Sequence, residues 1–498
     1  MKESTTTNSF ERVLDARLVL SVIAAGIMSF SGVTVETAMN VTFPSLMAEF
    51  GITTSTVQWM TTSYLLVLAT VVPMSSYLNR RFRTRSVFIA AMAFYIAGIA
   101  CGFTAISFPM LLCGRILEGM GTGIALPLMF NIITEQAPKK NMGVMMGVGT
   151  LVTAMAPAVG PSVGGWLDEN YGWRMIFAAL LPVLGVAFVL GVLSIRQSHE
   201  VTRDPFDVPG WLAIAASFAT LVFAVDLGSS LGWTSPAELS LLAAFAVLLV
   251  LFVRREGRAD HPLISLAVFS RRRFVLGVVA LVCLQFVVLG LSFLIPNYSQ
   301  LVMGTGETEA GSILLPGCVV GACMAPLSGQ ILDRFGPRRP ILVGAACALL
   351  GTALFAALSQ SLPTALAIAI YVCFAFGQSL MVGNTMTESL LFLPSAIKAD
   401  GNAVINTLQQ LAGAIGTSVV TAIVNATQVG ATDMAWATMT STREAYLLLA
   451  CVAVVPLASM AWVTARHRRQ RPRPPARCAC CCPPAASACH GRCVGPHR

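Results

Sequence analysis

Long apolar stretches alternate with short polar turns along almost the whole chain. About twenty consecutive apolar residues are enough to cross a bilayer as an α-helix, and runs of this length recur from residue 18 onward. The predicted spans are 18–44, 57–78, 86–106, 110–134, 143–166, 173–195, 209–229, 237–253, 274–299, 310–332, 341–359, 364–390, 402–426 and 445–465. The pattern therefore predicts an all-α polytopic membrane protein with fourteen spans.

The composition agrees with a membrane location. Of the 498 residues, 56% are hydrophobic and only 11% are charged, whereas a soluble protein has about 25% charged residues. The polar N-terminus lacks a small-residue cleavage site, so we expect the first apolar run to be a retained span. We predict a multi-pass protein of the plasma membrane.

The placement of the basic residues predicts the orientation. With the N-terminus inside, 29 of the 32 Lys and Arg fall in cytoplasmic loops and termini; Arg174 and Arg443 lie outside, and Arg115 lies within a span. This is the positive-inside distribution, and it places both termini in the cytoplasm. The net charge of +9 is explained by topology, so we expect no nucleic-acid partner.

Two similar stretches indicate an internal repeat. "SSYLNRRFRTR" (75–85) and "GQILDRFGPRR" (329–339) each end a span and open a short basic turn, 254 positions apart. Duplicated helical units that move about a central site are typical of secondary transporters. The predicted parts are a cytoplasmic N-terminal segment (1–17), a six-helix bundle (18–195), two accessory spans with linkers (196–273), a second six-helix bundle (274–465) and a disordered basic, cysteine-rich cytoplasmic tail (466–498).

The cysteines and histidines do not predict a metal site or a cofactor. Eight cysteines are scattered singly through spans, where a small apolar residue is the simplest interpretation. The other six lie in the tail near His490, and their spacing matches no zinc pattern, so a disordered tail is favoured over a metal-binding tract. With no phosphate-binding loop and no histidine in a span, we expect an ion gradient to be the energy source.

The stretch "APAVGPSVGGW" (156–166) places helix breakers inside a span. Gly160 and Gly164 form a small-xxx-small pair that lets two helices approach closely, and Pro161 removes a backbone donor. We predict a gate and seal here, formed with Pro157 and Gly165. Ordinary helix packing by small residues is the alternative.

Ionisable residues within spans are the strongest candidates for function, because a carboxylate at mid-membrane costs about 2.5–3.5 kcal/mol on insertion scales. Four such residues stand out: Glu36, Arg115, Glu118 and Asp226. Arg115 and Glu118 are three apart and share a helix face. We predict that Glu36 couples transport to protons and that Arg115 and Glu118 modulate it. A purely structural ion pair is the alternative for the latter two.

Uncharged polar residues in or near spans are further candidates. Asn40, Asn384, Gln409 and Gln410 offer hydrogen bonds to a substrate. Hydrogen bonds between neighbouring helices are the alternative.

Several ordered motifs resemble one known family. "GQILDRFGPRR" resembles the loop signature of the major facilitator superfamily, "RILEGMGTG" (115–123) its fourth-span motif, and "APAVGPSVGG" the fifth-span motif of its exporters. Fourteen spans, "WRMIF" (173–177) and "NTLQQLAGAIGT" (406–417) resemble its 14-helix drug:proton antiporter branch, the EmrB/QacA type, nearest the lincomycin-resistance-like members. The resemblance covers about residues 18–465 and implies the major facilitator fold, two six-helix bundles plus two inserted helices.

The resemblance also assigns the cytoplasmic loop motif. Its positions here are Asn79, Arg80, Arg83, Gly329, Asp333, Arg334, Gly336, Arg338 and Arg339. The first copy departs from the family because Asn79 replaces an aspartate and Phe82 a glycine, so the resemblance does not imply a latch built on that carboxylate in the first half. Glu36 is displaced by one position from the aspartate of the commoner branch, and Glu118 stands where the family has glutamine. The basic residues of both loops are equally explained as topology anchors.

These features together predict a drug:proton antiporter that exports amphipathic drugs or toxicants by alternating access. We expect small-molecule substrates, protons and the lipid bilayer as partners, and a monomer. The alternative is an exporter of one physiological compound, such as a lipid, siderophore or metabolite. A membrane-embedded enzyme would need a clustered His/Asp or Asp/Asp pair at a membrane face, which the sequence does not contain, so we predict no enzymatic activity.

Overall fold

The structure, a computed structural model of the chain, describes residues 15–138, 142–197, 206–231, 235–259, 265–360, 362–394, 397–428 and 433–470. Within these residues the chain is helical and has no strand. This confirms the predicted all-α class. Most of the predicted N-terminal segment and of the cysteine-rich tail lies outside the described residues.

The helices follow the predicted spans. In chain order they are α1 (Ala16–Val41), α2 (Phe43–Phe50), α3 (Thr54–Arg81), α4 (Thr84–Phe103), α5 (Phe108–Gln136), α6 (Met142–Tyr171), α7 (Arg174–Ser194), α8 (Val208–Leu231), α9 (Pro236–Glu256), the 3₁₀ helix η1 (Leu266–Ser270), α10 (Arg272–Leu301), α11 (Glu307–Ser312), α12 (Leu315–Phe335), α13 (Arg338–Leu358), α14 (Thr364–Leu391), α15 (Lys398–Gln428) and α16 (Met434–Gln470). The last helix runs past the predicted boundary at 465.

Thirteen helices among the described residues are long and apolar enough to cross a membrane. The remaining predicted span, 143–166, lies within α6, a single helix of 30 residues. Two predicted spans are broken, because 18–44 extends into α2 and 310–332 divides into α11 and α12. Pro44 and Pro316 lie in the first turns of α2 and α12, where a missing backbone N–H is tolerated and a new helix can begin.

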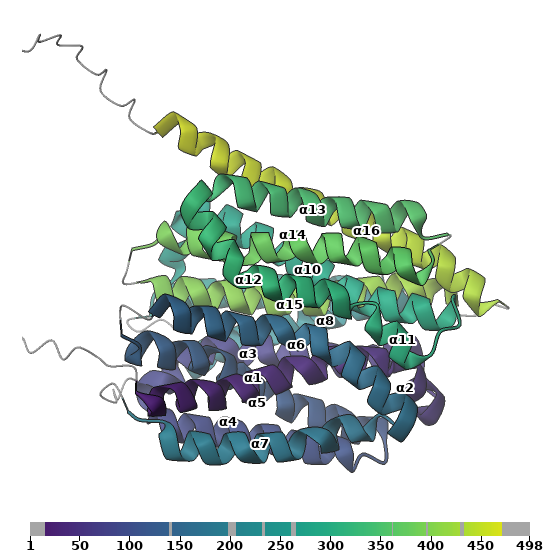
Figure 1. Cartoon of the computed structure of the whole chain (residues 1–498), viewed down its shortest axis with the longest axis horizontal. Helices are drawn as coiled ribbons and strands as arrows, with labels where there is room; N and C mark the ends of the chain where they lie inside the picture. Colours follow the sequence, from purple (N-terminus) through teal and green to yellow (C-terminus); the bar gives the residue numbers. More distant parts are fainter. Residues whose placement is uncertain are drawn as a thin grey trace, which may run out of the picture.

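The helices form two halves and an accessory pair (Figure 1). Helices α1–α7 pack on one another, as do α10–α16, and the halves meet where α3 contacts α15 and α6 contacts α11 and α12. Helices α8 and α9 pack together, and α8 contacts both α3 and α15. The accessory pair therefore lies along the seam between the halves.

The repeat seen in the sequence recurs in the helix ends. An offset of 254 carries Arg81, the last residue of α3, onto Phe335, the last of α12. It also carries Thr84, the first residue of α4, onto Arg338, the first of α13. The turns between these helices therefore occupy equivalent places in the two halves.

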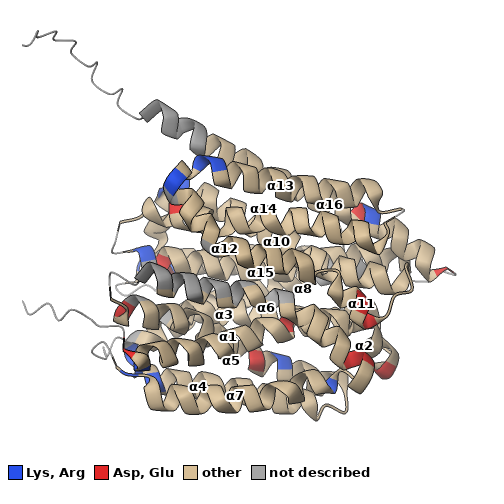
Figure 2. Ribbon diagram, in the orientation of Figure 1, with Lys and Arg blue, Asp and Glu red and all other residues tan. Residues whose placement is uncertain are grey.

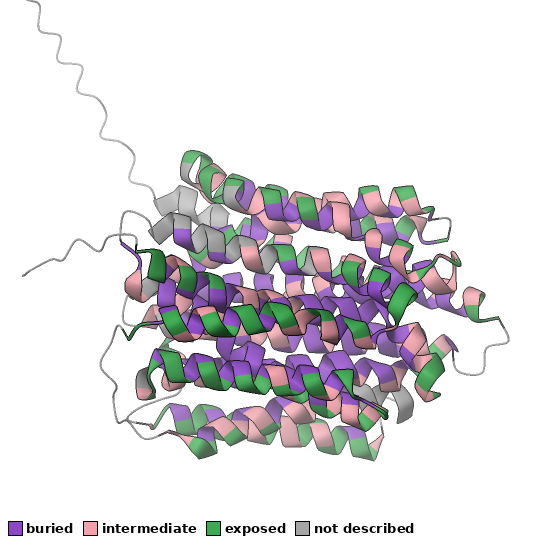
Figure 3. Ribbon diagram, turned by 60° about the horizontal axis from the view of Figure 1, so that its bottom comes forward, coloured by how far each residue is buried: buried purple, intermediate pink, exposed green. Residues whose placement is uncertain are grey.

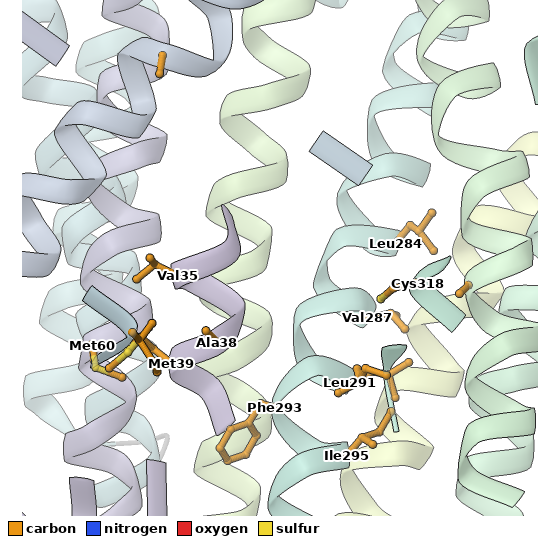
Figure 4. Packing of buried hydrophobic residues seen from close by; sticks show 14 of the residues in the cluster. Val35, Ala38, Met39, Met60, Leu284, Val287, Leu291, Phe293, Ile295 and Cys318 are labelled. Carbon is orange, nitrogen blue, oxygen red and sulfur yellow. The ribbon is translucent and has the colours of Figure 1, made fainter. Parts of the chain in front are cut away.

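Apolar side chains occupy both the interior and much of the outer surface. Figure 3 shows buried faces turned inward on most helices, with exposed residues on the outer faces. Many of the exposed residues are large and apolar, as at Val186 and Leu193 of α7. The interior core spans both halves, and Figure 4 shows Met39 and Met60 in the first and Leu284 and Leu291 in the second. An apolar exterior of this extent is what contact with lipid requires.

Charged residues gather at the two ends of the helical bundle (Figure 2). At one end α3, α9 and α12 finish in arginine-rich turns; we call this the basic end. The opposite end holds α2 and α11 and the carboxylates of Glu49, Asp168, Glu169, Glu307 and Glu309. We call it the acidic end.

The described hydrogen bonds between the halves all lie in the portion of the bundle nearer the acidic end. They join Asn40 to Ser292, Ser45 to Glu307, Thr54 to Gln428, Gln58 and Thr62 to Ser418, Ser162 to Gly311, Gln300 to Val41, and Thr308 to Glu169. Most of these residues are buried. The two halves are therefore held together at the acidic end.

Candidate functional site

A buried ion pair lies inside the first half. Nη1 of Arg115 and Oε2 of Glu118 are 2.5 Å apart, and neither side chain is exposed to solvent. Both residues belong to α5, where a spacing of three places them on one face of the helix. A single unpaired charge is strongly disfavoured in an apolar bundle, so each residue needs the opposite charge of the other to remain buried and ionised.

Helix α3 supplies the other contacts of Arg115. The guanidinium donates from Nε to the main-chain carbonyl of Met60 at 3.3 Å. It also lies over the ring of Tyr64, with Cζ 4.4 Å from the ring centroid, which is cation–π geometry. Arg115 is thus fixed between a carboxylate, a carbonyl and an aromatic face.

Several polar atoms around this pair have no protein partner. They are Nη2 of Arg115, Oε1 of Glu118 and the hydroxyl of Tyr95, all buried. A buried polar group without a hydrogen bond costs about 1–3 kcal/mol. These donors and acceptors can therefore form hydrogen bonds in another conformation of the protein or with a bound molecule.

Glu36 of α1 is the second carboxylate near this cation. It is 4% exposed and lies within the electrostatic reach of Arg115, although Arg115 forms its ion pair with Glu118. Two carboxylates thus lie near one guanidinium, which pairs with Glu118, and the three groups carry a net charge of −1 when all are ionised. One bound proton makes this buried group neutral.

The uncharged candidates are not brought into one cluster. Asn40 accepts a hydrogen bond from Thr61 at 2.9 Å and donates to Ser292 of the other half at 3.3 Å. Asn384 is buried and donates to a carbonyl of its own helix, at Leu380. Gln409 and Gln410 are half-buried in α15. Asn40 is therefore the one of these four seen to bridge the halves.

One predicted charged candidate remains untested by the geometry. Asp226 lies in α8, and its side chain is outside the described part of the structure.

The small residues of α6 lie at tight helix contacts. A Cβ atom on Gly164 would stand 2.7 Å from Cβ of Ala38 in α1, and one on Gly160 would overlap Thr37 of the same helix. Gly165 faces the backbone of Glu307 in the other half. Two of these glycines thus pack against α1, and the third lies at the seam.

The prolines of this stretch do not interrupt the helix, since α6 runs from Met142 to Tyr171 through both. The Pro161 carbonyl lies against Gly311 of α11. The side chain of Pro157 is outside the described part of the structure.

The two loop motifs adopt different turns. Gly336 follows α12 with a φ of +71°, in a region that favours glycine. Its counterpart Phe82 is extended, with a φ of −118°. Asn79 donates to Glu135 of α5 at 3.1 Å, a contact within the first half. The replacement of glycine by Phe82 in the first turn is therefore accompanied by a different backbone conformation.

The other motif residues lie at the basic end. Gly329, Arg334, Arg338, Arg339 and Arg83 are exposed. The side chains of Arg80 and Asp333 are outside the described part of the structure.

Sequence reasoning missed the aromatic surroundings of the ion pair. Tyr64 of α3 and Tyr95 of α4 are both fully buried, and each carries a hydroxyl. A tyrosine deep within a predicted apolar span was the available signal, because a buried hydroxyl normally needs a partner.

A separate apolar pocket of about 360 Å³ opens among α1, α5, α6 and α7. Its lining includes Val22, Gly26, Met129 and Val152, and none of the three charged residues contributes to it. The ion pair therefore belongs to a different part of the first half.

Within the described residues, no group of three or more His, Cys, Asp or Glu side chains is placed to hold a metal ion. The six cysteines of the tail lie outside those residues.

The family model of the Major Facilitator Superfamily matches residues 25–417 of the chain. Among characterised relatives, the lincomycin resistance protein LmrB of Bacillus subtilis (strain 168) is 35% identical, over 85% of this chain and 88% of its own length. A multidrug resistance protein B homolog of Mycobacterium tuberculosis (strain ATCC 25618 / H37Rv) is 31% identical over 80% of this chain and 74% of its own.

Solved structures share the arrangement of helices at low sequence identity. The structure of a bacterial homolog of the human lysosomal transporter Spinster, inward-facing and unoccupied, is 16% identical with a TM-score of 0.65. The match covers 92% of this chain and 99% of that one. The predicted fold is confirmed by this likeness.

Proposed function

Since the chain belongs to the major facilitator superfamily and is a multi-pass membrane transporter rather than an enzyme, we propose that it is a drug:proton antiporter. It exports amphipathic drugs or toxicants from the cytoplasm by alternating access. The proton gradient is its energy source, and no cofactor takes part.

The buried trio of Glu36, Arg115 and Glu118 is the observation that carries this proposal. The guanidinium of Arg115 pairs with Glu118 and acts electrostatically on Glu36, in a site shielded from solvent. Such a site favours the state with one bound proton, because an unbalanced charge in apolar surroundings is costly. Glu36 is the proton carrier, since Glu118 already holds Arg115.

Coupling follows from competition for the same negative charge. A cationic or polar cargo that reaches Glu36 replaces its proton, and protonation from the other side displaces the cargo. One proton moving inward through about 100 mV supplies about 2.3 kcal/mol, enough for a roughly fiftyfold gradient of a neutral solute.

The names of the relatives support a drug as cargo. LmrB of B. subtilis is named for lincomycin resistance and the M. tuberculosis relative for multidrug resistance. The apolar pocket and the apolar core of the bundle suit amphipathic compounds better than strongly charged ones.

The charge distribution supports an orientation in the plasma membrane. The basic end faces the cytoplasm together with both termini, and the acidic end faces outward. In this orientation the structure is closed toward the outside. We also propose that the protein works as a monomer.

The test uses purified protein in liposomes with an imposed pH gradient and lincomycin or ethidium as cargo. The wild type accumulates cargo on the acidic side, and a protonophore abolishes the accumulation. In Glu36→Gln the accumulation is lost and the ratio of cargo across the membrane falls to about one, because the residue no longer takes up a proton.

Glu309→Gln is the matched control, since Glu309 is an exposed acid at the acidic end. It should retain wild-type accumulation. Undiminished accumulation by Glu36→Gln contradicts the coupling role, and transport of a single lipid, siderophore or metabolite but no drug favours the specialised exporter.

A further inference from the structure

At the acidic end the main chains of the two halves come close together. Gly165 of α6 lies against the main chain of Glu307 in α11, and Gly311 of α11 lies against the carbonyl of Pro161. Ser162 also donates to the Gly311 carbonyl at 3.4 Å. Because no side chain separates the two segments, any polar group here lies directly on the seam.

Three polar side chains from three helices meet at this seam. Asp168 of α6 is 8% exposed, and its carboxyl lies within hydrogen-bonding reach of Glu307 from α11 and Ser45 from α2. The Ser45 hydroxyl donates to Oε1 of Glu307. Oδ2 of Asp168 is buried and has no donor facing it. The two carboxyl groups therefore lie in contact, and the neighbouring side chains do not provide enough hydrogen-bond donors for all of their oxygens.

The neighbouring charged groups do not supply the missing donor. Glu169 accepts the backbone N–H of Thr308 at 3.0 Å. Arg174 of α7 is held by Glu49 of α2 at 2.7 Å, and its hydrogen bond lowers the pKa of Glu49, which keeps that pair ionised.

The remaining charged groups on the helices around Asp168 are also engaged elsewhere. Glu309 of α11 accepts the hydroxyl of Thr364, and Glu36, Arg115 and Glu118 lie deeper in the first half. The Asp168 carboxyl accepts the backbone N–H of Trp173, while the single proton of the Ser45 hydroxyl is donated to Glu307.

We propose that Asp168 and Glu307 bind one proton between them and that this proton holds the acidic end closed. Two carboxylates in contact cannot both stay ionised, whereas a carboxylic acid donating to a carboxylate forms a strong, short hydrogen bond. Once the proton leaves, two negative charges face each other across the seam and the halves repel. The pair is thus a proton-binding site built from both halves.

The direction of the pH effect follows from the carboxyl groups themselves. Burial, and next the charge of Glu307, raise the pKa of Asp168 to about 8 in the closed state. In an open, hydrated state an aspartate has a pKa of about 3.9. Closing therefore takes up a proton between these values, and the closed-to-open ratio falls about tenfold for each unit of rising pH, then levels off above about 8.

This site differs from the trio of Glu36, Arg115 and Glu118 because it is exposed to the solution on only one side of the membrane. Opening at the acidic end exposes Asp168 and Glu307 to that side alone, so the proton returns to the side from which it came. Asp168 and Glu307 therefore make the closed-to-open ratio of the acidic end depend on the pH at that end. They do not add to the number of protons carried across the membrane. It stands whether or not Glu36 couples transport.

Hydrogen–deuterium exchange of the full chain in lipid nanodiscs tests the proposal without cargo or gradient. After correction for intrinsic exchange rates, protection of segments 161–171 and 305–312 should fall by up to about a hundredfold from pH 6 to pH 8. Asp168→Asn should keep both segments protected at both pH values, because the amide donates permanently to Glu307. Glu307→Gln should do the same from the other half.

Glu169→Gln is the matched control, since it removes the adjacent acid of the same helix and should retain the wild-type pH response. The proposal is overturned if wild-type protection does not depend on pH. It is also overturned if either Asp168→Asn or Glu307→Gln, eluting as a monodisperse folded protein, responds to pH as the wild type does.

Discussion

The two halves share a helical plan but differ in where they hold buried charge. At the offset of 254, Glu36 corresponds to Gly290, Arg115 to Ala369 and Glu118 to Val372. The first half therefore contains a buried ion pair with a second acid beside it, and the equivalent place in the second half is uncharged.

The turn after the second span shows the opposite bias. The second half keeps Gly336 at positive φ, while the first half has Phe82 in extended conformation. Duplicated halves thus preserve helix length and position, because apolar burial requires only a suitable pattern. Individual polar residues can differ between the halves, and here the buried charged residues Glu36, Arg115 and Glu118 are found in the first half.

The largest expected effect comes from removing the cation of the first half. Arg115→Leu leaves Glu118 and Glu36 without a counter-charge in a buried site, which we expect to cost about 3–5 kcal/mol. The midpoint of thermal unfolding in detergent should fall accordingly.

The double variant Arg115→Leu with Glu118→Leu provides the comparison, since it removes both members of the ion pair and leaves apolar side chains there, as at Ala369 and Val372 in the second half. It should recover most of the lost stability. An unchanged midpoint in the single variant would mean that the pair is not held as ions.

A smaller effect is expected at the packing of α6 on α1, a contact within the first half. In Gly164→Leu the new side chain collides with Ala38, and overpacking of this kind costs about 1–3 kcal/mol. We expect efflux to be lost while membrane insertion persists, measured as drug accumulation in cells alongside the amount of protein in the membrane.

Gly185→Leu in α7 is its control, because a Cβ atom there meets open space. It should transport normally. Equal transport by both variants would remove the idea that close packing of α6 is needed for gating.

The smallest effect is expected at the paired turns. Gly336→Ala forces an L-residue into a backbone region that favours glycine, at a cost of about 1–3 kcal/mol, whereas Phe82→Ala leaves an extended backbone unstrained. Thermal unfolding should show a lower midpoint for the first variant and little change for the second. Equal shifts would mean that the turns are equivalent after all.

Much of the fold was accessible from local pattern. The apolar runs placed most helices to within a few residues, although α16 begins at Met434 and the predicted span only at 445, and the repeated basic turn identified the register of the two halves. The breaks before α2 and α12 were missed, because a proline in the first turn of a new helix looks, in an apolar run, like a proline inside one.

The candidate site was accessible only in part. The spacing of Arg115 and Glu118 placed them on one face, and the structure shows them as an ion pair. The ring of Tyr64 over Arg115 was missed because it comes from another helix. The contact between Asp168 and Glu307 joins positions 139 residues apart in the chain.

The sequence by itself determined the membrane class, the helices, the charged ends and the pairs that lie within one helix. These depend on composition and on spacing along a single element, which the chain carries locally. Tertiary structure alone decided which aromatic ring covers Arg115 and which residues of the two halves meet at the acidic end, Asp168 and Glu307 among them. Those contacts depend on how separate helices pack, and helix packing is set by the shapes of all their side chains together.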